Sequence, residues 1–454
     1  MAARDRLVCR PRLAGMTGQL LLALAALILG ARLAAAEAAD TKRELHLLRQ
    51  QNEAMQQQVQ RQQELIDSLG RAVAEMKGTA APSTADSAAT RTTLQPETHA
   101  AQTAPGAARK LAISGEAGLA FFRSGANGKY PKGAMRADEA KVFIEAPVWT
   151  DAYCFAELNL YGREDPSGVM SAGEIYLDFE NVSRWWGRDG QLSLRLGRLD
   201  IPFGEEYLSR DAIDNPGIFH SLADFWGVDE GIEIYGALGG LQYVLAVQNG
   251  GHPSLNDFSS GQSVTVRLGW DPVNWLHLGA SAMRTGGLDV ASDKLSELWF
   301  ADGFIRSVGS ARTTTFRANL LQGDAKARWR EGHLALSGGA LRYSDNDPLR
   351  HNARTVTFYS VEALQNLTKG LYTIARYSAI DAGKGFPLLG DGTFARSFFG
   401  RLSERLSRLS LGAGYRLSPN LVLKADYSFN RGREVGGRQR TDENIIGSEV
   451  AVRF

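Results

Sequence analysis

Strict alternation of apolar and polar side chains runs through most of the chain after residue 110, and this feature constrains the fold most. "QLSLRLG" (191–197) places three leucines on one face and Ser193 and Arg195 on the other. "SVTVRLGW" (263–270) repeats the pattern with Val264 and Val266 against Thr265. Such alternation is typical of a strand with one apolar and one polar face. Helical periodicity is nearly absent from this region, so we predict an all-β domain.

The alternating segments predict sixteen antiparallel strands. They lie near 111–122, 139–147, 151–161, 172–181, 190–198, 228–236, 240–249, 262–270, 274–284, 313–330, 333–343, 354–365, 370–380, 405–417, 420–430 and 445–454. The strand at 313–330 needs a bulge near Gly323 to keep its faces in step. Short turns alternate with long loops, of which the longest are 199–227, 285–312 and 381–404. This pattern favours a 16-stranded antiparallel transmembrane β-barrel over 110–454. A soluble β-sandwich or β-helix is the alternative.

Three segments precede the barrel. Residues 1–36 combine four early arginines, a short apolar core and small residues, which predicts a cleaved signal peptide. Residues 37–77 carry apolar positions at alternating spacings of three and four, which predicts a short α-helical coiled coil in the periplasm. Its seam begins with Leu45, Leu48, Asn52, Met55, Val59, Gln62, Ile66 and Leu69. Residues 78–109 are rich in Ala, Thr and Pro and predict a flexible linker.

These segments predict a location and partners. A barrel with an export signal belongs in the bacterial outer membrane, with lipid around it and its N-terminal region in the periplasm. The coiled coil predicts a homo-oligomer, and peptidoglycan is a further candidate partner of that region. The last strand ends at Phe454, which we expect to close the barrel against the first strand and to be read by the barrel-assembly machinery. Without the signal peptide the chain has 46 basic and 49 acidic residues, so nucleic acid is not a predicted partner.

The charges predict a pore. Residues 110–260 hold 12 basic and 22 acidic side chains, whereas 261–454 hold 26 basic and 18 acidic ones. The loop 199–227 contains carboxylates together with apolar residues that a free loop would leave exposed to water. We therefore expect it to fold into the barrel as a constriction. Its predicted acidic residues are Asp200, Glu205, Glu206, Asp211 and Asp214. The predicted basic wall consists of Arg195, Arg198, Arg267, Arg317, Lys326, Arg328, Arg330 and Lys424.

The run "LGRLDIPFGEEYLSRDAIDNP" (196–216) resembles the constriction-loop entry of the phosphate-selective porins O and P. The resemblance implies a trimeric porin whose inward arginines and lysines carry anions, and Arg198 matches the basic position before Pro202, Phe203 and Gly204. The lysine cluster of that family is missing, because only nine lysines follow residue 109. A general or sugar-permeable porin therefore stays open beside a phosphate-selective one.

Two other functions stay open. An envelope tether would use the coiled coil to span the periplasm and the barrel as an anchor. An outer-membrane hydrolase would need a nucleophile with a base, and His220 with Ser221 is the nearest candidate pair. That pair has no convincing third member, so the protein is predicted not to be an enzyme. We predict no metal or cofactor site.

Overall fold

The computed structural model describes residues 111–161, 170–250, 261–289, 313–347, 352–386 and 403–454. The predicted signal peptide, coiled coil and linker lie outside these residues and remain predictions. Among the described residues, no helix is both long enough and apolar enough to cross a membrane.

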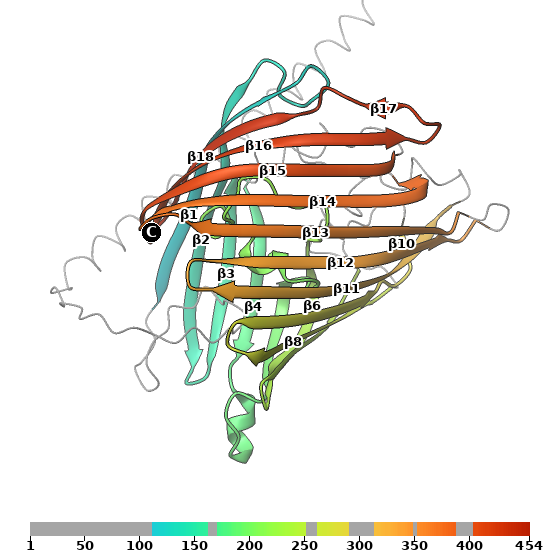
Figure 1. Cartoon of the computed structure of the whole chain (residues 1–454). Helices are drawn as coiled ribbons and strands as arrows, with labels where there is room; N and C mark the ends of the chain where they lie inside the picture. The colour runs from blue at the N-terminus through green and yellow to red at the C-terminus, as the bar shows by residue number, and fades with distance from the viewer. Residues whose placement is uncertain (1–110, 162–169, 251–260, 290–312, 348–351, 387–402) are drawn as a thin grey trace, which may run out of the picture. The chain divides into compact units, whose positions relative to one another are not determined.

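Sixteen long strands form one antiparallel sheet that closes on itself (Figure 1). In chain order they are β1 (Ala112–Ser124), β2 (Ala134–Trp149), β3 (Ala152–Tyr161), β4 (Ser171–Phe179), β5 (Ser193–Asp200), β6 (Val228–Leu238), β7 (Leu241–Gln248), β8 (Ser263–Val273), β9 (Leu276–Arg284), β11 (Thr315–Trp329), β12 (Gly332–Asp345), β13 (Arg354–Asn366), β14 (Leu371–Phe386), β15 (Ser403–Ser418), β16 (Leu421–Glu434) and β18 (Ile445–Arg453). Each pairs with the next, and β18 pairs with β1, so the predicted 16-stranded antiparallel barrel is confirmed.

Four shorter elements lie in the connections between the long strands. They are the two-residue strands β10 (Leu288–Asp289) and β17 (Gln439–Arg440) and the 3-10 helices η1 (Val182–Trp186) and η2 (Glu206–Ser209). The barrel closes where Gly115 exchanges backbone hydrogen bonds with Phe454, at 3.0 and 2.9 Å. An unpaired strand edge is thereby removed.

The strands are unequal in length. The strands of one wall, β3 to β7, have 8 to 11 residues each, and we call this the short-stranded wall. The strands of the other wall, β11 to β16, have 13 to 16 residues and form the long-stranded wall, drawn from yellow-orange to red in Figure 1. At about 3.4 Å per residue the second set reaches farther toward the long loops.

The outer surface is apolar. Aliphatic side chains such as Leu321, Leu336, Leu411 and Val450 are exposed in the middle of the strands. Aromatic side chains mark the end with the short turns, and the exposed ones are Trp149, Trp185, Trp186, Trp270, Trp275, Trp329 and Tyr415. A soluble sandwich would hide its apolar faces, whereas a membrane barrel exposes an apolar band edged by aromatic residues.

The predicted bulge near Gly323 is wrong. The register of β11 is continuous against both β9 and β12. The inward face of β11 is instead apolar at its loop end, with Phe316 and Leu320 buried, and polar farther on, with Gln322 and Lys326. The inward face of β11 thus changes from apolar to polar along the strand, because only its loop end packs against apolar residues inside the barrel.

Candidate functional site: a loop folded inside the barrel

Residues 201–227, which connect β5 to β6, lie inside the barrel, and we call this segment the inner loop. Ile201, Phe203 and Phe225 are almost fully buried in one cluster with inward residues of the long-stranded wall. The wall contributes residues including Phe316, Leu320, Leu341, Tyr343, Val356, Phe358, Ile380 and Leu406, and β9 adds Met283. The apolar residues of the loop thus explain the apolar inward face of β11.

A second part of the inner loop packs beside the closure of the barrel. Ile218 and Phe219 join a cluster with Phe122 of β1 and Ile445 of β18, and the rings of Phe122 and Phe219 are 6.0 Å apart. Ala212 and Ile213 join another cluster, whose remaining members are Tyr372, Val422 and Ala451. Burial of these side chains holds the loop against β14, β16, β18 and β1.

Basic residues of the same wall bind the backbone of the inner loop. Arg376 donates to the carbonyl of Phe219 at 2.6 Å and to Asn215 Oδ1 at 3.1 Å. Its guanidinium also pairs with Glu362, where Nε lies 2.7 Å from Oε2. Charged hydrogen bonds of this kind are stronger than neutral ones and fix geometry. Arg376 therefore works as an anchor of the loop.

Lys424 of β16, two strands along from Arg376 of β14, binds the inner loop in the same way. Its ammonium donates to the carbonyls of Ala212, Asn215 and Gly217 at 2.5, 3.3 and 3.2 Å. It also lies 2.8 Å from a carboxylate oxygen of Glu449. The ammonium is surrounded by three carbonyl oxygens of the loop and by the Glu449 carboxylate, so Lys424 binds the loop and does not project into free space.

Two further arginines of β15 extend the set. Arg408 donates to the carbonyl of His220 at 3.3 Å, and Arg416 donates to the carbonyl of Ile213 at 3.2 Å. Together with Arg376 and Lys424, these groups donate hydrogen bonds to backbone carbonyls that would otherwise be buried without donors. Sequence reasoning missed Arg376, Arg408 and Arg416, although each lies on the inward parity of its strand.

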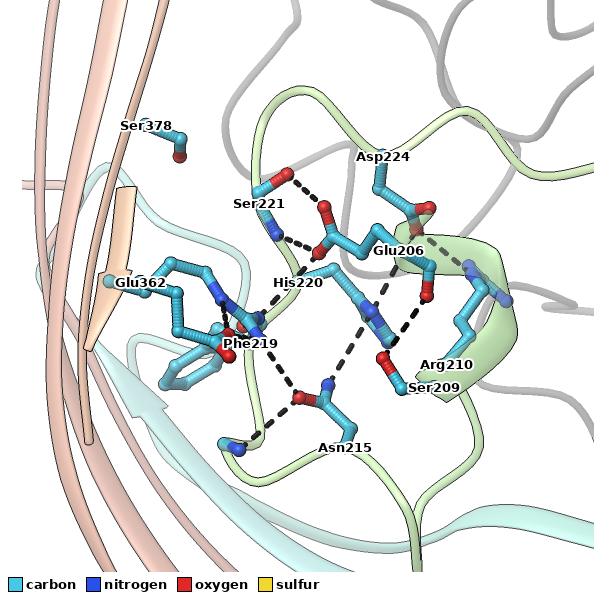
Figure 2. Close-up of polar contacts among 12 residues, drawn as sticks. Glu206, Ser209, Arg210, Asn215, Phe219, His220, Ser221, Asp224, Glu362 and Ser378 are labelled. Atoms are coloured by element: carbon cyan, nitrogen blue, oxygen red, sulfur yellow. Dashed lines mark hydrogen bonds and ion pairs between the residues drawn. The ribbon is translucent and has the colours of Figure 1, made fainter. Parts of the chain in front are cut away.

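The carboxylates of the inner loop are paired with neighbouring cations. Asp211 accepts from Lys141 at 2.6 Å, Asp214 pairs with Arg453, and Glu205 accepts from Arg267 at 2.8 Å. The loop also pairs internally, because Arg210 donates to Asp224 at 2.9 Å (Figure 2). Among these pairs, Glu205 with Arg267 joins a predicted acidic residue of the loop directly to a predicted residue of the basic wall.

Glu205 and Glu206 are adjacent but have opposite environments. Burial raises the pKa of Glu206, and the nearby Arg376 offsets this effect only in part. Burial also acts on Glu205, but the His277 imidazole and the Arg267 guanidinium outweigh it, and the pKa of Glu205 lies below its ordinary value. Acidification therefore protonates Glu206 before Glu205.

The other predicted basic residues have varied positions. Arg195 is buried between Asp178 and Glu233, at 2.7 and 3.1 Å. Lys326 and Arg328 lie on the inward parity of β11, below the apolar part. Arg330 lies in a short turn and is exposed, so its assignment to the pore wall is wrong.

Arg198 and Arg317 point outward, and their predicted place on the inner wall is wrong. Arg198 is paired in register with Ile175 and Glu230, on the face that exposes Ile175 and Ile232. Its guanidinium lies 2.5 Å from Glu230. Arg317 shares the outward parity of Leu321 on β11. Alternation fixes which residues share a face, and at these two positions the charged face is the outer one.

A charged cavity of about 80 Å³ lies between part of the inner loop and the strands β2 to β6. Its acidic lining residues are Glu157, Glu174, Asp200, Asp211, Asp214 and Glu233, and its basic ones are Lys141, Arg195 and Arg210. Tyr176, Tyr207, Leu208 and Trp226 complete the lining. We call this space the acidic cavity, since six carboxylates face three cations there. Asp200, Asp211 and Asp214 were among the predicted site residues.

One group of carboxylates has the composition of a cation site. Oxygens of Glu116, Glu139 and Asp211 lie within 4.8 Å of one another. The ammonium of Lys141 already lies 2.6 Å from Asp211 and 3.0 Å from Glu139. Lys141 thus supplies positive charge at the place where a metal ion would bind, and sequence reasoning had not singled it out.

The candidate hydrolase pair does not have the geometry of a catalytic pair. The hydroxyl of Ser221 donates to the Glu206 carboxylate and not to His220, as Figure 2 shows. The same hydroxyl accepts from the backbone of Ala223 at 3.0 Å. His220 Nδ1 lies 3.5 Å from Asn215 and 3.8 Å from Asp224. These contacts hold the loop in shape, and they direct the Ser221 hydroxyl to Glu206 instead of His220.

No family model matches the chain, and no curated protein matches it. Among solved structures, the outer membrane channel DcaP of Acinetobacter baumannii matches with a TM-score of 0.52 at 12% identity, covering 76% of this chain and 97% of that one. A loop L8 deletion mutant of OmpT, an outer membrane protein of Vibrio cholerae, matches with a TM-score of 0.51 at 11% identity, covering 76% and 99%. These likenesses show a shared barrel fold. The relationship to phosphate-selective porins stays a prediction.

Proposed function

We propose that the protein is an outer-membrane porin, a water-filled channel through which small hydrophilic solutes diffuse passively. The apolar band and aromatic edge of the outer surface support a place in the membrane. The matched channel of Acinetobacter baumannii supports conduction by analogy of fold. The observation that carries the proposal is the inner loop, which narrows the barrel without filling it beside the acidic cavity.

The route runs between the inner loop and the wall formed by β2 to β6. On the opposite side the loop packs tightly, through apolar clusters and through Arg376 and Lys424. Charged and aromatic side chains line the cavity that is left, including Glu157, Tyr207 and Arg195. A narrow space lined by fixed charges selects solutes by size and charge.

The excess of carboxylates in the acidic cavity favours cations over anions. A fixed charge in a confined, partly dehydrated space attracts counter-ions more strongly than it does in bulk water. Four basic residues of the long-stranded wall compensate little, because they donate to the inner loop: Arg376, Arg408, Arg416 and Lys424. Phosphate is accordingly a poor candidate for the solute, and small cations and neutral solutes are better ones.

Planar-bilayer recording tests this function. The purified protein should form open channels in KCl, and in a KCl gradient the reversal potential should show K⁺ passing more readily than Cl⁻. The preference should shrink as the salt concentration rises, because salt screens fixed charges over about 10 Å at 0.1 M. Absence of conductance would refute the channel, whereas an anion preference would refute the role given to the acidic cavity.

The predicted homo-oligomer also belongs to this proposal. Arg198 and Glu230 form an ion pair on the outer surface of the short-stranded wall. The two side chains are 12% and 21% exposed, and a second copy of the chain that covers this remaining area would shield the pair from lipid. Native mass spectrometry in a mild detergent should show trimers, and Arg198→Ala should weaken them more than Arg123→Ala on β1.

The other predicted partners remain predictions. Peptidoglycan binding and the tether would use the coiled coil, which lies outside the described residues. Deletion of 41–77 separates the two functions, because a tether loses envelope integrity while a porin keeps its conductance. Recognition by the barrel-assembly machinery through Phe454 is likewise untested.

A further inference from the structure

Three exposed arginines lie close together on the outer surface of the barrel, near the long loops. Arg284 of β9 pairs in register with Asn319 of β11, and Asn319 pairs with Arg342 of β12. Neighbouring strands are about 4.8 Å apart, so the Cα atoms of Arg284 and Arg342 lie roughly 10 Å from each other. Arg317 lies two residues beyond Asn319, and we call these three residues the arginine cluster.

Among the described residues, the arginine cluster has no protein counter-ion. Within the part of the chain that the structure describes, none of the three guanidinium groups makes an ion pair or a hydrogen bond. Two other exposed arginines of the outer surface do have partners: Arg405 lies 3.4 Å from Asp381, and Arg433 lies 2.8 Å from Glu404. Three like charges without a counter-ion repel one another, so the cluster favours an external anion.

An apolar groove of about 460 Å³ lies directly below the cluster, on the same strands. Small side chains form its floor, and they are Ala280, Ala282, Gly323, Gly338 and Ala340. Val266, Leu268 and Leu321 border it. A Cβ atom added to Gly323 would meet nothing within 4 Å, so the groove is open to the outside at this residue. Ala282 is two residues below Arg284, and Ala340 is two residues below Arg342.

The depth of the cluster matches that of a lipid headgroup. On β11, ten residues separate Asn319 from Trp329, which belongs to the aromatic edge at the other end. Ten residues extend about 34 Å along a strand, or about 26 Å along the membrane normal at a tilt near 40°. The apolar band of an outer-membrane barrel is about 25 Å tall. The cluster therefore lies at the opposite membrane interface, above the hydrocarbon.

From this arrangement we propose that the arginine cluster and the groove form one binding site for a phosphorylated lipid of the outer leaflet. The phosphate group binds to Arg284, Arg317 and Arg342, and an acyl chain lies over Gly323 and Gly338. Only an amphipathic anion satisfies both halves, because a free phosphate leaves the groove empty and a neutral lipid leaves the arginines unpaired. The proposal depends on a place in the membrane but not on conduction.

Lipid binding to the purified protein tests the site. Native mass spectrometry would measure retention of three probes: bis-phosphorylated lipid A, its dephosphorylated form, and inorganic phosphate. The native protein should retain the bis-phosphorylated lipid, the dephosphorylated form about tenfold less, and inorganic phosphate not at all. Retention of all lipids alike, or of inorganic phosphate alone, would overturn the proposal.

Variants assign the two halves of the site. Replacement of Arg284, Arg317 and Arg342 by Gln should reduce retention of the bis-phosphorylated lipid about tenfold. A matched triple, Arg123→Gln, Arg431→Gln and Arg438→Gln, removes the same charge elsewhere and should leave retention unchanged. Equal losses in the two triples would mean that net charge, and not this site, binds the lipid.

The groove has its own variant. Gly323→Leu fills it from a position where a side chain meets no neighbour, and it should weaken retention of both lipid forms while leaving the arginines in place. Unchanged retention in Gly323→Leu would refute the acyl half. Channel conductance should be normal in every variant that folds, so failure of this proposal is distinguishable from failure of the channel proposal.

Discussion

The long-stranded and short-stranded walls both turn buried charges toward the inside of the barrel, yet the charges have different partners. On the long-stranded wall, Arg376 and Arg408 donate to backbone carbonyls of the inner loop. On the short-stranded wall and neighbouring β2, Glu157, Glu174 and Lys141 face the acidic cavity. The same residue types therefore position a loop on one side and line a space on the other.

The comparison shows that the charge of a wall does not by itself give the charge of the pore. A lysine that donates to buried carbonyls, such as Lys424, stabilises the fold. Its charge attracts a solute in the pore only weakly. Removing one partner from such a buried set leaves the other polar groups unsatisfied, which costs more than an exposed pair does. The two walls should thus respond differently to substitution.

The largest effect is expected at Arg376. Arg376→Ala leaves Oε2 of Glu362 and the Phe219 carbonyl without their donor, and we expect a loss of about 3–5 kcal/mol in the free energy of unfolding. The inner loop should also loosen, so single-channel conductance should rise and become noisy. Arg405→Ala on β15, whose side chain is half exposed beside Asp381, is the matched control and should change either quantity little. Equal effects would refute the anchoring role.

A somewhat smaller effect is expected in the apolar part of the same wall. Phe316→Ala empties a position that packs inside the barrel, and it should reduce the free energy of unfolding by about 3–4 kcal/mol. Leu321→Ala, on the outward parity of the same strand, should cost less, about 1 kcal/mol. The Leu321 side chain is exposed on the outer surface, so its removal leaves no cavity inside the barrel. Denaturant titration in lipid vesicles measures both. A reversed order would mean that β11 is out of register.

Selectivity should change on the short-stranded side. Glu157→Gln, Glu174→Gln and Asp200→Asn together replace three carboxyl groups of the acidic cavity with neutral amides, so the K⁺ to Cl⁻ permeability ratio should fall. The control triple replaces carboxylates at the outer surface: Asp381→Asn, Glu404→Gln and Glu434→Gln. Its reversal potential should equal that of the native protein, and a shift as large as in the cavity triple would contradict the assigned route.

The smallest effect is a titration of the inner loop. Because the pKa of Glu206 is raised by burial, acidification should neutralise this group before Glu205, weakening its attraction for Arg376 and its hold on Ser221. Channel noise should therefore increase as the pH falls. Glu206→Gln should show that noise at neutral pH and lose the pH dependence, whereas Glu205→Gln should keep it. A midpoint below 4 would disagree with the raised pKa.

The barrel was predictable from the sequence because alternation, turn lengths and strand count agree with one another. The inner loop was predictable too, since Ile201, Phe203 and Phe225 could not remain exposed in a free loop. Arg267 was correctly placed on an inward face by the parity of "SVTVRLGW".

The individual contacts were not predictable, for two physical reasons. Alternation says which residues share a face, but not which face is inward where both faces carry polar groups, as at Arg198 and Arg317. Near Gly323 the inward face of β11 changes from apolar to polar. In the sequence this change looked like a bulge that switches the strand from one face to the other. Contacts between the inner loop and Arg376 or Lys424 join residues some 150 to 210 positions apart, and local patterns carry no information about them.

The central claim is that solutes pass between the inner loop and the short-stranded wall, and modification of single cysteines tests it most directly. In a background with Cys9→Ser and Cys154→Ser, Glu174→Cys lies at the acidic cavity, and Ser410→Cys lies buried on the long-stranded wall. A bulky, water-soluble thiol reagent should cut the current of the Glu174→Cys channel and leave that of Ser410→Cys unchanged. Block at Ser410→Cys with no effect at Glu174→Cys would contradict the account.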